Sequence, residues 1–256
     1  MRKQVLYLLG FILIIFISNV FAINPDSTFT GIAPSAISTQ MILILTKNWE
    51  DSTGVLFRYE RNKFGENWTQ IGTAFPVTVG RSGLAWGTGL HGSTLDKGPV
   101  KHEGDGKAPA GVFRLSKIFG YESLENVKWL NMPYIHVDSC AECIDDTNSK
   151  YYNTIIDDRK VIHRDWKSSE HMKLSDNEYE WGIFVENNSM PRIKGNGSCI
   201  FLHIWEDEGI PTAGCSSMKE DNLIEILHWL NINSSPVLVQ LPQTEYNRLK
   251  FKWALP

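Results

Sequence analysis

Short apolar runs rich in branched and aromatic residues recur along the chain, and glycine-rich stretches separate them. Runs of this length and composition are typical of β-strands. The clearest pair is Gln40–Thr46 with Val55–Tyr59, where the turn Asp51–Gly54 predicts an antiparallel hairpin. Four further strands are predicted over Phe75–Val79, Gly182–Glu186, Cys199–Trp205 and Val237–Leu241. The chain is therefore predicted to be mainly β, with loops of defined conformation over Gly80–Gly92 and Gly104–Gly111.

Only two segments carry a helical pattern. After Cys215, apolar residues recur at one-face helical spacing, and Ser217 followed by Glu220 has the spacing of a capping box. This pattern predicts a helix from about Met218 to Leu230. A second, shorter helical segment is predicted over Ser168–Lys173.

The first residues form a cationic start followed by an apolar run over Val5–Ile17 and a small-residue site that ends at Ala22. This order is typical of a secretory signal peptide. The run is shorter than the roughly 18 to 20 residues that span a bilayer. We expect residues 1–22 to be a cleaved signal peptide and residues 23–256 to form a single domain. No later stretch is apolar enough to cross a membrane, so we expect no stable membrane insertion after cleavage.

The net charge restricts the class of partner. The chain has 25 basic and 29 acidic residues, giving a formal charge of −4. Removal of the signal peptide takes away Arg2 and Lys3 but no acidic residue, so the mature chain is more acidic. A nucleic acid or an anionic membrane is therefore not an expected partner.

Four cysteines in an exported protein are usually paired in two disulfides. If Cys215 is instead a free nucleophile, one of the other three has no partner. Cys140 and Cys143 are too close in sequence to close a large loop, whereas Cys143 with Cys199 would close a long one. The spacing leaves both pairings open. His136 lies near Cys140 and Cys143, but a fourth ligand is not evident, so we expect neither a metal nor a cofactor.

The best candidates for chemistry are His203 and Cys215, which lie 12 positions apart. A strand, a turn and a returning segment can bring them side by side, as a thiol and its base require. The helix predicted after Cys215 would lower the pKa of its thiol. The backbone amides of Gly214 and Cys215 could point at a developing oxyanion. These residues alone also fit a structural disulfide at Cys215 beside a core histidine.

Several motifs together resemble the catalytic domain of the L,D-transpeptidase (YkuD-type) family, in a divergent branch. The resemblance covers roughly residues 75 to 241. Its segments, in order, are Gly80–Gly87, Glu103–Phe113, Cys143–Asn153, Gly195–His203 and Pro211–Cys215. Several motifs in the right order are more specific than one.

The resemblance implies an enzyme with a β-sandwich-like, mostly antiparallel fold and few helices. In that family a histidine activates a cysteine, which attacks the bond after the third residue of a peptidoglycan stem peptide and expels D-alanine. Cys215 would be the nucleophile and His203 the base. An amine then resolves the thioester to a cross-link, or water resolves it to a shortened peptide. The expected location is the periplasm or the secreted, envelope-associated fraction.

Two positions depart from the family pattern Ser/Thr-His-Gly-Cys-x-Arg. Ala213 stands where the second histidine would be, and Ser217 where the arginine would be. The identity of the acyl acceptor is therefore open, between an L,D-transpeptidase, an L,D-carboxypeptidase and an amidase-like cysteine hydrolase. Candidate substrate-binding residues are Arg81 and Lys107, which could bind stem carboxylates, and Thr212.

Two other classes of protein are alternative hypotheses. One is a non-catalytic domain that binds the cell wall and holds Cys215 in a disulfide. The other is a papain-like protease, which the order of residues disfavours because there the cysteine usually precedes the histidine.

Overall fold

The computed structural model describes residues 33–92 and 97–256, so the predicted signal peptide lies outside the described residues. The strands are β1 (Gln40–Thr46), β2 (Thr53–Glu60), β3 (Thr69–Thr78), β4 (Leu84–Trp86), β5 (Ala108–Gly120), β6 (Tyr134–His136), β7 (Ala141–Cys143), β8 (Ile155–Asp157), β9 (Glu170–His171), β10 (Trp181–Val185), β11 (Phe201–Ile204), β12 (Ser216–Met218) and β13 (Val237–Pro242). The helices are α1 (Glu220–Trp229) and α2 (Gln243–Leu249), with short 3₁₀ turns at Asp158–Lys160 and Ile232–Ser234.

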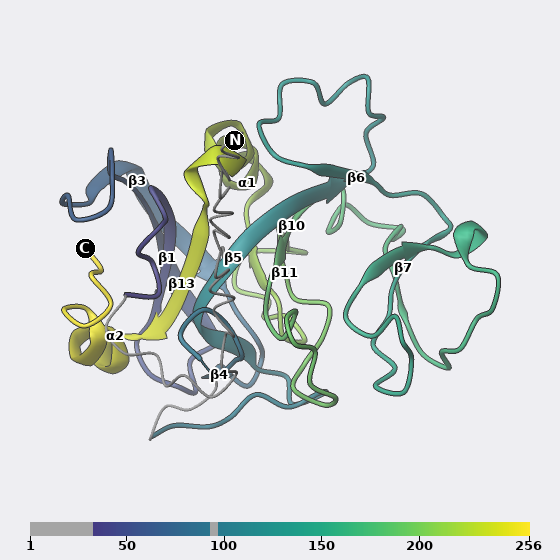
Figure 1. Cartoon of the computed structure of the whole chain (residues 1–256), viewed down its shortest axis with the longest axis horizontal. Helices are drawn as coiled ribbons and strands as arrows, with labels where there is room; N and C mark the ends of the chain where they lie inside the picture. The colour runs from purple at the N-terminus through teal and green to yellow at the C-terminus, as the bar shows by residue number, and fades with distance from the viewer. Residues whose placement is uncertain (1–32, 93–96) are drawn as a thin grey trace, which may run out of the picture. The chain divides into compact units, whose positions relative to one another are not determined.

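The larger sheet has the strand order β10-β11-β12-β3-β2-β1-β13-β5-β4, and β6 pairs with β5. Because β10 also pairs with β5, the path closes on itself. Most pairings are antiparallel, and the parallel ones are β1 with β13, β11 with β12, β4 with β5 and β5 with β6. Figure 1 shows β13, β5 and β10 side by side in this sheet. The prediction of a mainly β, sandwich-like fold with few helices is confirmed.

The core lies inside this sheet and under α1. Met41 to Ile44 of β1 are all at most 1% exposed, so both faces of that strand are covered. A strand covered on both faces reads as a continuous apolar run without alternation, as the sequence of β1 does. The helix α1 buries Leu223, Ile226 and Leu227 against the same core.

The predicted strands are confirmed, with shifted ends at some of them. β1 spans the predicted residues, and it pairs with β2 as the expected antiparallel hairpin. The strands β3, β10, β11 and β13 overlap the other four predicted runs.

Two glycine-rich stretches predicted as loops contain strands. Gly80–Gly92 includes β4, and the last four residues of Gly104–Gly111 begin β5, a strand of 13 residues. Gly111 has no side chain, and the ring of His91 lies in the space that a side chain there would occupy. A Cβ there would lie 2.0 Å from His91 Cε1. Glycine thus marks a close approach here and not a turn.

Of the two helical predictions, one needs correction at its start and the other is wrong. The helix after Cys215 is confirmed, but it begins at Glu220, and the capping box at Ser217 is wrong. Ser217 belongs to β12, where its Oγ lies 2.7 Å from Thr78 Oγ1. The helix predicted over Ser168–Lys173 is also wrong, because this segment contains β9, which pairs with β7. In both places a neighbouring strand supplies the backbone hydrogen bonds that a helix would have supplied.

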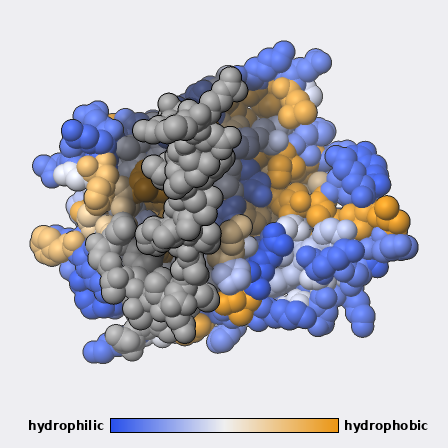
Figure 2. Space-filling view, viewed as in Figure 1, coloured by the Kyte–Doolittle hydropathy of each residue, from blue (hydrophilic) through white to orange (hydrophobic). Residues whose placement is uncertain are grey.

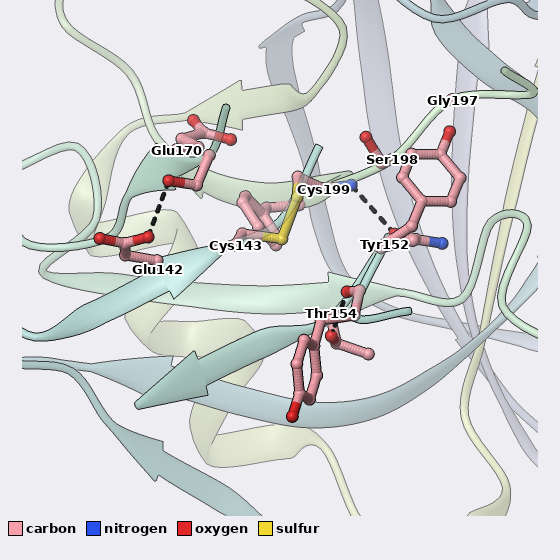
Figure 3. Close-up of a disulfide and its surroundings, with 12 residues drawn as sticks. Glu142, Cys143, Tyr152, Thr154, Glu170, Gly197, Ser198 and Cys199 are labelled. Carbon is pink, nitrogen blue, oxygen red and sulfur yellow. Dashed lines mark hydrogen bonds between the residues drawn. A yellow bond between two sulfur atoms is a disulfide. The ribbon is translucent and has the colours of Figure 1, made fainter. Parts of the chain in front are cut away.

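A second, three-stranded sheet has the order β8-β7-β9. A disulfide joins Cys143 of β7 to Cys199, which lies just before β11, as Figure 3 shows. Of the two pairings that the sequence left open, this is the one observed. Cys140 and Cys215 are free thiols, so the alternative that places Cys215 in a disulfide is contradicted.

The surface around β7 is largely hydrophilic, with a few hydrophobic residues among the polar ones (Figure 2). Within residues 33–92 and 97–256, no helix has the length and apolar character needed to cross a membrane.

We predict that loss of the Cys143–Cys199 disulfide lowers the free energy of unfolding by about 2–4 kcal/mol, because the bond closes a long loop in the unfolded chain. The sequence separation of the two cysteines is 56. Chemical denaturation of the Cys143→Ser/Cys199→Ser protein measures this change. Cys140→Ser is the matched control and should leave the unfolding midpoint unchanged. An equal midpoint in the double variant and the wild type would contradict the prediction.

Candidate active site

The pairing of β11 with β12 brings His203 and Cys215 together. The two strands run parallel, with His203 opposite Ser217 and Leu202 opposite Ser216. The segment that carries Cys215 therefore pairs in parallel and does not return as a hairpin. Cys215 lies one residue before β12 and two before Ser217, so its side chain faces the same side of the sheet as that of His203. Such diagonal neighbours lie within reach of each other across a strand pair.

The thiol of Cys215 has two polar contacts, both with the segment that leads into β11. The Phe201 N–H lies 3.3 Å from Cys215 Sγ and donates to it. Cys215 Sγ lies 3.5 Å from the Cys199 carbonyl oxygen, which can accept the thiol proton. The disulfide to Cys143 and a hydrogen bond from the Cys199 N–H to Asn153 Oδ1, of 3.0 Å, hold Cys199 in place. The position of the Cys215 thiol thus depends on a fixed piece of backbone.

The imidazole of His203 is oriented by its own strand. Its Nδ1 lies 2.7 Å from the Ile204 carbonyl oxygen. A carbonyl can only accept a hydrogen bond, so Nδ1 carries the proton and Nε2 is free to accept one. The ring of Tyr179 packs edge-on against the imidazole, with 5.2 Å between ring centroids. This arrangement gives a neutral histidine the tautomer of a general base.

Burial controls the charge state of the pair. Burial lowers the pKa of His203 to about 4, although its hydrogen bond to Ile204 opposes this shift. Burial also raises the pKa of the Cys215 thiol, and the charge of Glu170 adds to the rise. The expected lowering of this pKa by a helix end is therefore wrong, because a strand and not a helix follows Cys215. At neutral pH the free protein holds a thiol and a neutral imidazole.

Cys215 and His203 line the same cavity, which has a volume of about 390 Å³. Other parts of its wall are Thr212, Ala213 and Gly214 from the segment before β12. Ser217 also lines it, but its hydroxyl is hydrogen-bonded to Thr78. Cys215, His203 and the two positions that depart from the family pattern therefore line one cavity.

The amides predicted to form an oxyanion site are placed differently. The Gly214 N–H donates to Thr212 Oγ1 at 3.1 Å, and Thr212 Oγ1 in turn donates to the Cys215 carbonyl oxygen at 2.7 Å. The hydroxyl of Thr212 thus shapes the turn that presents Cys215. An oxyanion role at this turn depends more on the Cys215 N–H than on that of Gly214.

The two cations proposed for substrate carboxylates lie elsewhere. Arg81 is exposed, and Lys107 Nζ donates to the Ser82 carbonyl oxygen at 2.5 Å. Neither is among the described residues that line the cavity. The lysine that lines it is Lys101, which is 3% exposed and forms an ion pair of 2.6 Å with Asp105. Sequence reasoning missed Lys101 because its ion pair with Asp105 forms in a loop, where a spacing of four residues does not indicate contact.

Acidic residues of the cavity were also missed. Glu103, within the segment that resembles the family, accepts a hydrogen bond of 2.9 Å from Ser198 and another from Tyr152. Glu170 comes from β9, which the sequence had predicted as helix, and accepts a hydrogen bond from Tyr179. Both carboxylates line the cavity.

His136, Cys140 and Cys143 were considered above as possible metal ligands. In the described part of the chain, no three histidine, cysteine, aspartate or glutamate side chains group as metal ligands would. His136 Nδ1 lies 2.9 Å from the Glu122 carbonyl oxygen.

Comparison with known proteins identifies one family. A model of the L,D-transpeptidase catalytic domain family (YkuD) matches residues 55–239. No curated protein and no solved structure matches the chain significantly. The matched range contains both His203 and Cys215.

We predict that alkylation of Cys215 by iodoacetamide rises about tenfold per pH unit from pH 6 to pH 9 without a plateau, because the thiolate is the reactive form and burial raises the thiol pKa. The rate of mass increase in a Cys140→Ser protein, kept non-reduced, measures it. The same protein with Cys215→Ala is the control and should not be alkylated. A plateau near pH 6–7 would instead indicate a thiolate paired with a protonated histidine.

Proposed function

Because the chain belongs to the L,D-transpeptidase catalytic domain family, we propose that it is an exported cysteine acyltransferase that acts on peptidoglycan stem peptides. The family supports peptidoglycan as the substrate class. The observation that carries the proposal is the placement of Cys215 and His203 on one face of paired strands, in one cavity. A free thiol beside a correctly tautomeric histidine is the arrangement that acyl transfer requires.

In the proposed reaction His203 Nε2 takes the proton of the Cys215 thiol as sulfur attacks the carbonyl carbon of the third residue of the stem. The carbonyl oxygen gains the negative charge, which the Cys215 N–H can stabilise. The C–N bond then breaks, His203 returns the proton to the departing D-alanine amine, and a thioester on Cys215 remains. The amine of another stem forms a cross-link from this thioester, or water releases a shortened peptide.

The resting charges favour proton transfer during attack over a thiolate formed beforehand. The pKa of His203 is about 4 and that of Cys215 is raised, so ionisation of the free pair is unfavourable. A general base that acts in the transition state avoids this cost. The Phe201 N–H at 3.3 Å from Cys215 Sγ supports the charge that sulfur acquires as the proton leaves.

The acyl acceptor is the less defined half of the reaction. Ala213 offers no polar side chain, and the Ser217 hydroxyl is occupied by Thr78. The wall therefore lacks the histidine and arginine that the family pattern has at these positions. We expect hydrolysis to compete with cross-linking more than is usual, so L,D-carboxypeptidase activity is part of the proposal.

The proposed location is the cell envelope, in the periplasm or outside the cell. The family acts in the cell wall, and the composition of residues 1–22 is that of a signal peptide. We propose cleavage after Ala22 and a single catalytic domain over residues 23–256. An acidic chain of this kind fits a peptide substrate better than a nucleic acid.

An amidase-like cysteine hydrolase is the alternative, since it would use the same pair of residues. It differs in the bond that it cuts. The non-catalytic alternative loses its main support because Cys215 is a free thiol.

We predict that the mature protein removes the terminal D-alanine from tetrapeptide stems of purified muropeptides and forms, in part, links between third residues. The thioester at the third residue reacts either with water, which gives the shortened peptide, or with an amine, which gives the link. Chromatography with mass spectrometry measures both products, and Cys215→Ala is the inactive control. Cleavage only at the bond between sugar and peptide would favour an amidase, and unchanged muropeptides would exclude this substrate class.

We predict that His203→Ala lowers kcat by about 100-fold to 10,000-fold, because a general base typically contributes that much. The protein should remain folded, so thermal melting is recorded beside turnover of the tetrapeptide. His228→Ala is a matched control on α1 and should retain wild-type turnover. Turnover close to wild type in a folded His203→Ala protein would mean that another group is the base.

A further inference from the structure

A carboxylate lies next to the ring nitrogen of His203 that does not take the thiol proton. Glu178 Oε2 is 3.9 Å from His203 Nδ1. The same nitrogen lies 2.7 Å from the Ile204 carbonyl oxygen, so its N–H donates to that carbonyl, and the carboxylate is a charged neighbour without a hydrogen bond of its own. Within residues 33–92 and 97–256, no other carboxylate oxygen lies within 4.0 Å of this imidazole.

The turn that precedes β10 holds Glu178 in this position. The Glu178 carbonyl oxygen accepts a hydrogen bond of 3.1 Å from the Ile204 N–H, and the Glu178 N–H donates to Asp176 Oδ1 at 3.1 Å. The next residue, Tyr179, packs its ring edge-on against the imidazole of His203. The turn therefore contacts both His203 and the residue that follows it, and it fixes the carboxylate beside Nδ1.

The proposed reaction places a positive charge on His203. When the proton of the Cys215 thiol moves to Nε2, the imidazole becomes an imidazolium with an N–H on both nitrogens. Burial disfavours that charge and lowers the pKa of His203 to about 4. A negative charge at 3.9 Å favours it, and the side chain of Glu178 is 28% exposed, so solvent screens this charge only in part.

The same carboxylate opposes ionisation of the thiol in the free protein. Burial raises the pKa of the Cys215 thiol, and the charges of Glu170 and Glu178 add to the rise. Glu178 thus acts in opposite directions on the two members of the pair. It disfavours a thiolate formed in advance, and it favours the imidazolium that forms during attack.

We propose that Glu178 is a positioning residue that stabilises the positive charge on His203 while the imidazole holds the proton of the Cys215 thiol. This inference rests on the proposed function. No bond to Glu178 forms or breaks. The proton moves from Cys215 Sγ to His203 Nε2 as the sulfur–carbon bond forms, and it passes to the departing amine as the C–N bond breaks. The Ile204 carbonyl sets the tautomer of the imidazole, and Glu178 stabilises its charge.

The test compares the wild type with Glu178→Gln, which removes the charge and keeps the shape of the side chain. Both proteins carry Cys140→Ser. The acyl donor is p-nitrophenyl acetate, and intact mass follows the initial rate at which Cys215 is acetylated, so no peptidoglycan is needed. At about pH 8 the wild type should be acetylated about 10-fold faster, the size expected for a charge that is partly exposed.

The pH dependence distinguishes a role of the charge from a structural role. Burial raises the pKa of Glu178, and the charges of Asp176 and Glu206 add to the rise. The stabilisation is therefore present above this raised pKa and is lost as the pH falls through it. At about pH 4.5 the ratio of the two acetylation rates should fall below about 2-fold. A ratio that stays constant with pH would overturn the inference.

This ratio isolates Glu178 because the other titratable groups that face it are present in both proteins. They are Asp176, Glu206, Glu170, Tyr121, His203 and Cys215.

Glu180→Gln is the matched control. Glu180 belongs to the same turn, is half-buried like Glu178, and is not among the described residues that line the cavity. This variant should be acetylated at the wild-type rate at both pH values. Alkylation by iodoacetamide reports the thiolate directly, so it should not be slower in Glu178→Gln than in the wild type. Slower alkylation would overturn the inference, because it indicates a distorted site.

The tetrapeptide stem separates this inference from the proposed reaction. Glu178→Gln should lower kcat for the stem about 10-fold with little change in KM. A pH-dependent acetylation ratio together with a stem that is not turned over would support the role of Glu178 and contradict only the proposed substrate. Equal stem turnover by the two proteins would overturn the role of Glu178 and leave acyl transfer intact. A wild type that neither donor acylates would contradict both.

Discussion

The parallel pairing of β11 with β12 is the constraint on which the site depends. It sets His203 opposite Ser217, and it therefore places Cys215 on the same face two residues earlier. A shift of one residue would turn Cys215 to the opposite face and separate the pair. The closed path of the larger sheet makes such a shift costly, because β12 also pairs with β3 and β11 also pairs with β10. The relative placement of His203 and Cys215 thus follows from strand register in a buried sheet.

The same burial decides how the site works chemically. A thiol and an imidazole that are taken out of water stay neutral, since ionisation without solvent is unfavourable. The pKa of His203 falls to about 4 and that of Cys215 rises. A substrate carbonyl near sulfur changes this balance, because the charge then moves to an oxygen that backbone N–H groups can stabilise. The carboxylates of Glu170 and Glu178 near the pair also disfavour a thiolate formed before the attack.

Much of this could be predicted from the sequence. Continuous apolar runs indicate buried strands, and such runs predict β1 and β11. His203 and Cys215 emerged from residue type and spacing together with the resemblance to the family. The helix predicted over Ser168–Lys173 and the capping box at Ser217 were wrong for the same reason, which is that pairing with distant strands determines the structure there. β9 and β12 are too short to carry a periodic signal, and they exist because β7, β11 and β3 supply their hydrogen bonds. Glu170 and Lys101 were missed because long-range contacts bring them to the cavity.

The location of the covalent intermediate tests the proposed role of Cys215 most directly. The wild-type protein is mixed with a tetrapeptide stem, quenched in acid within its first turnovers, digested without reduction and mapped by tandem mass spectrometry. We predict a mass increase equal to the stem peptide without its terminal D-alanine, on the peptide that contains Cys215. We also predict that this adduct forms more slowly in the His203→Ala protein. An adduct on Cys140, or a Cys215 peptide that stays unmodified while product accumulates, would contradict the proposed role of Cys215 as the nucleophile.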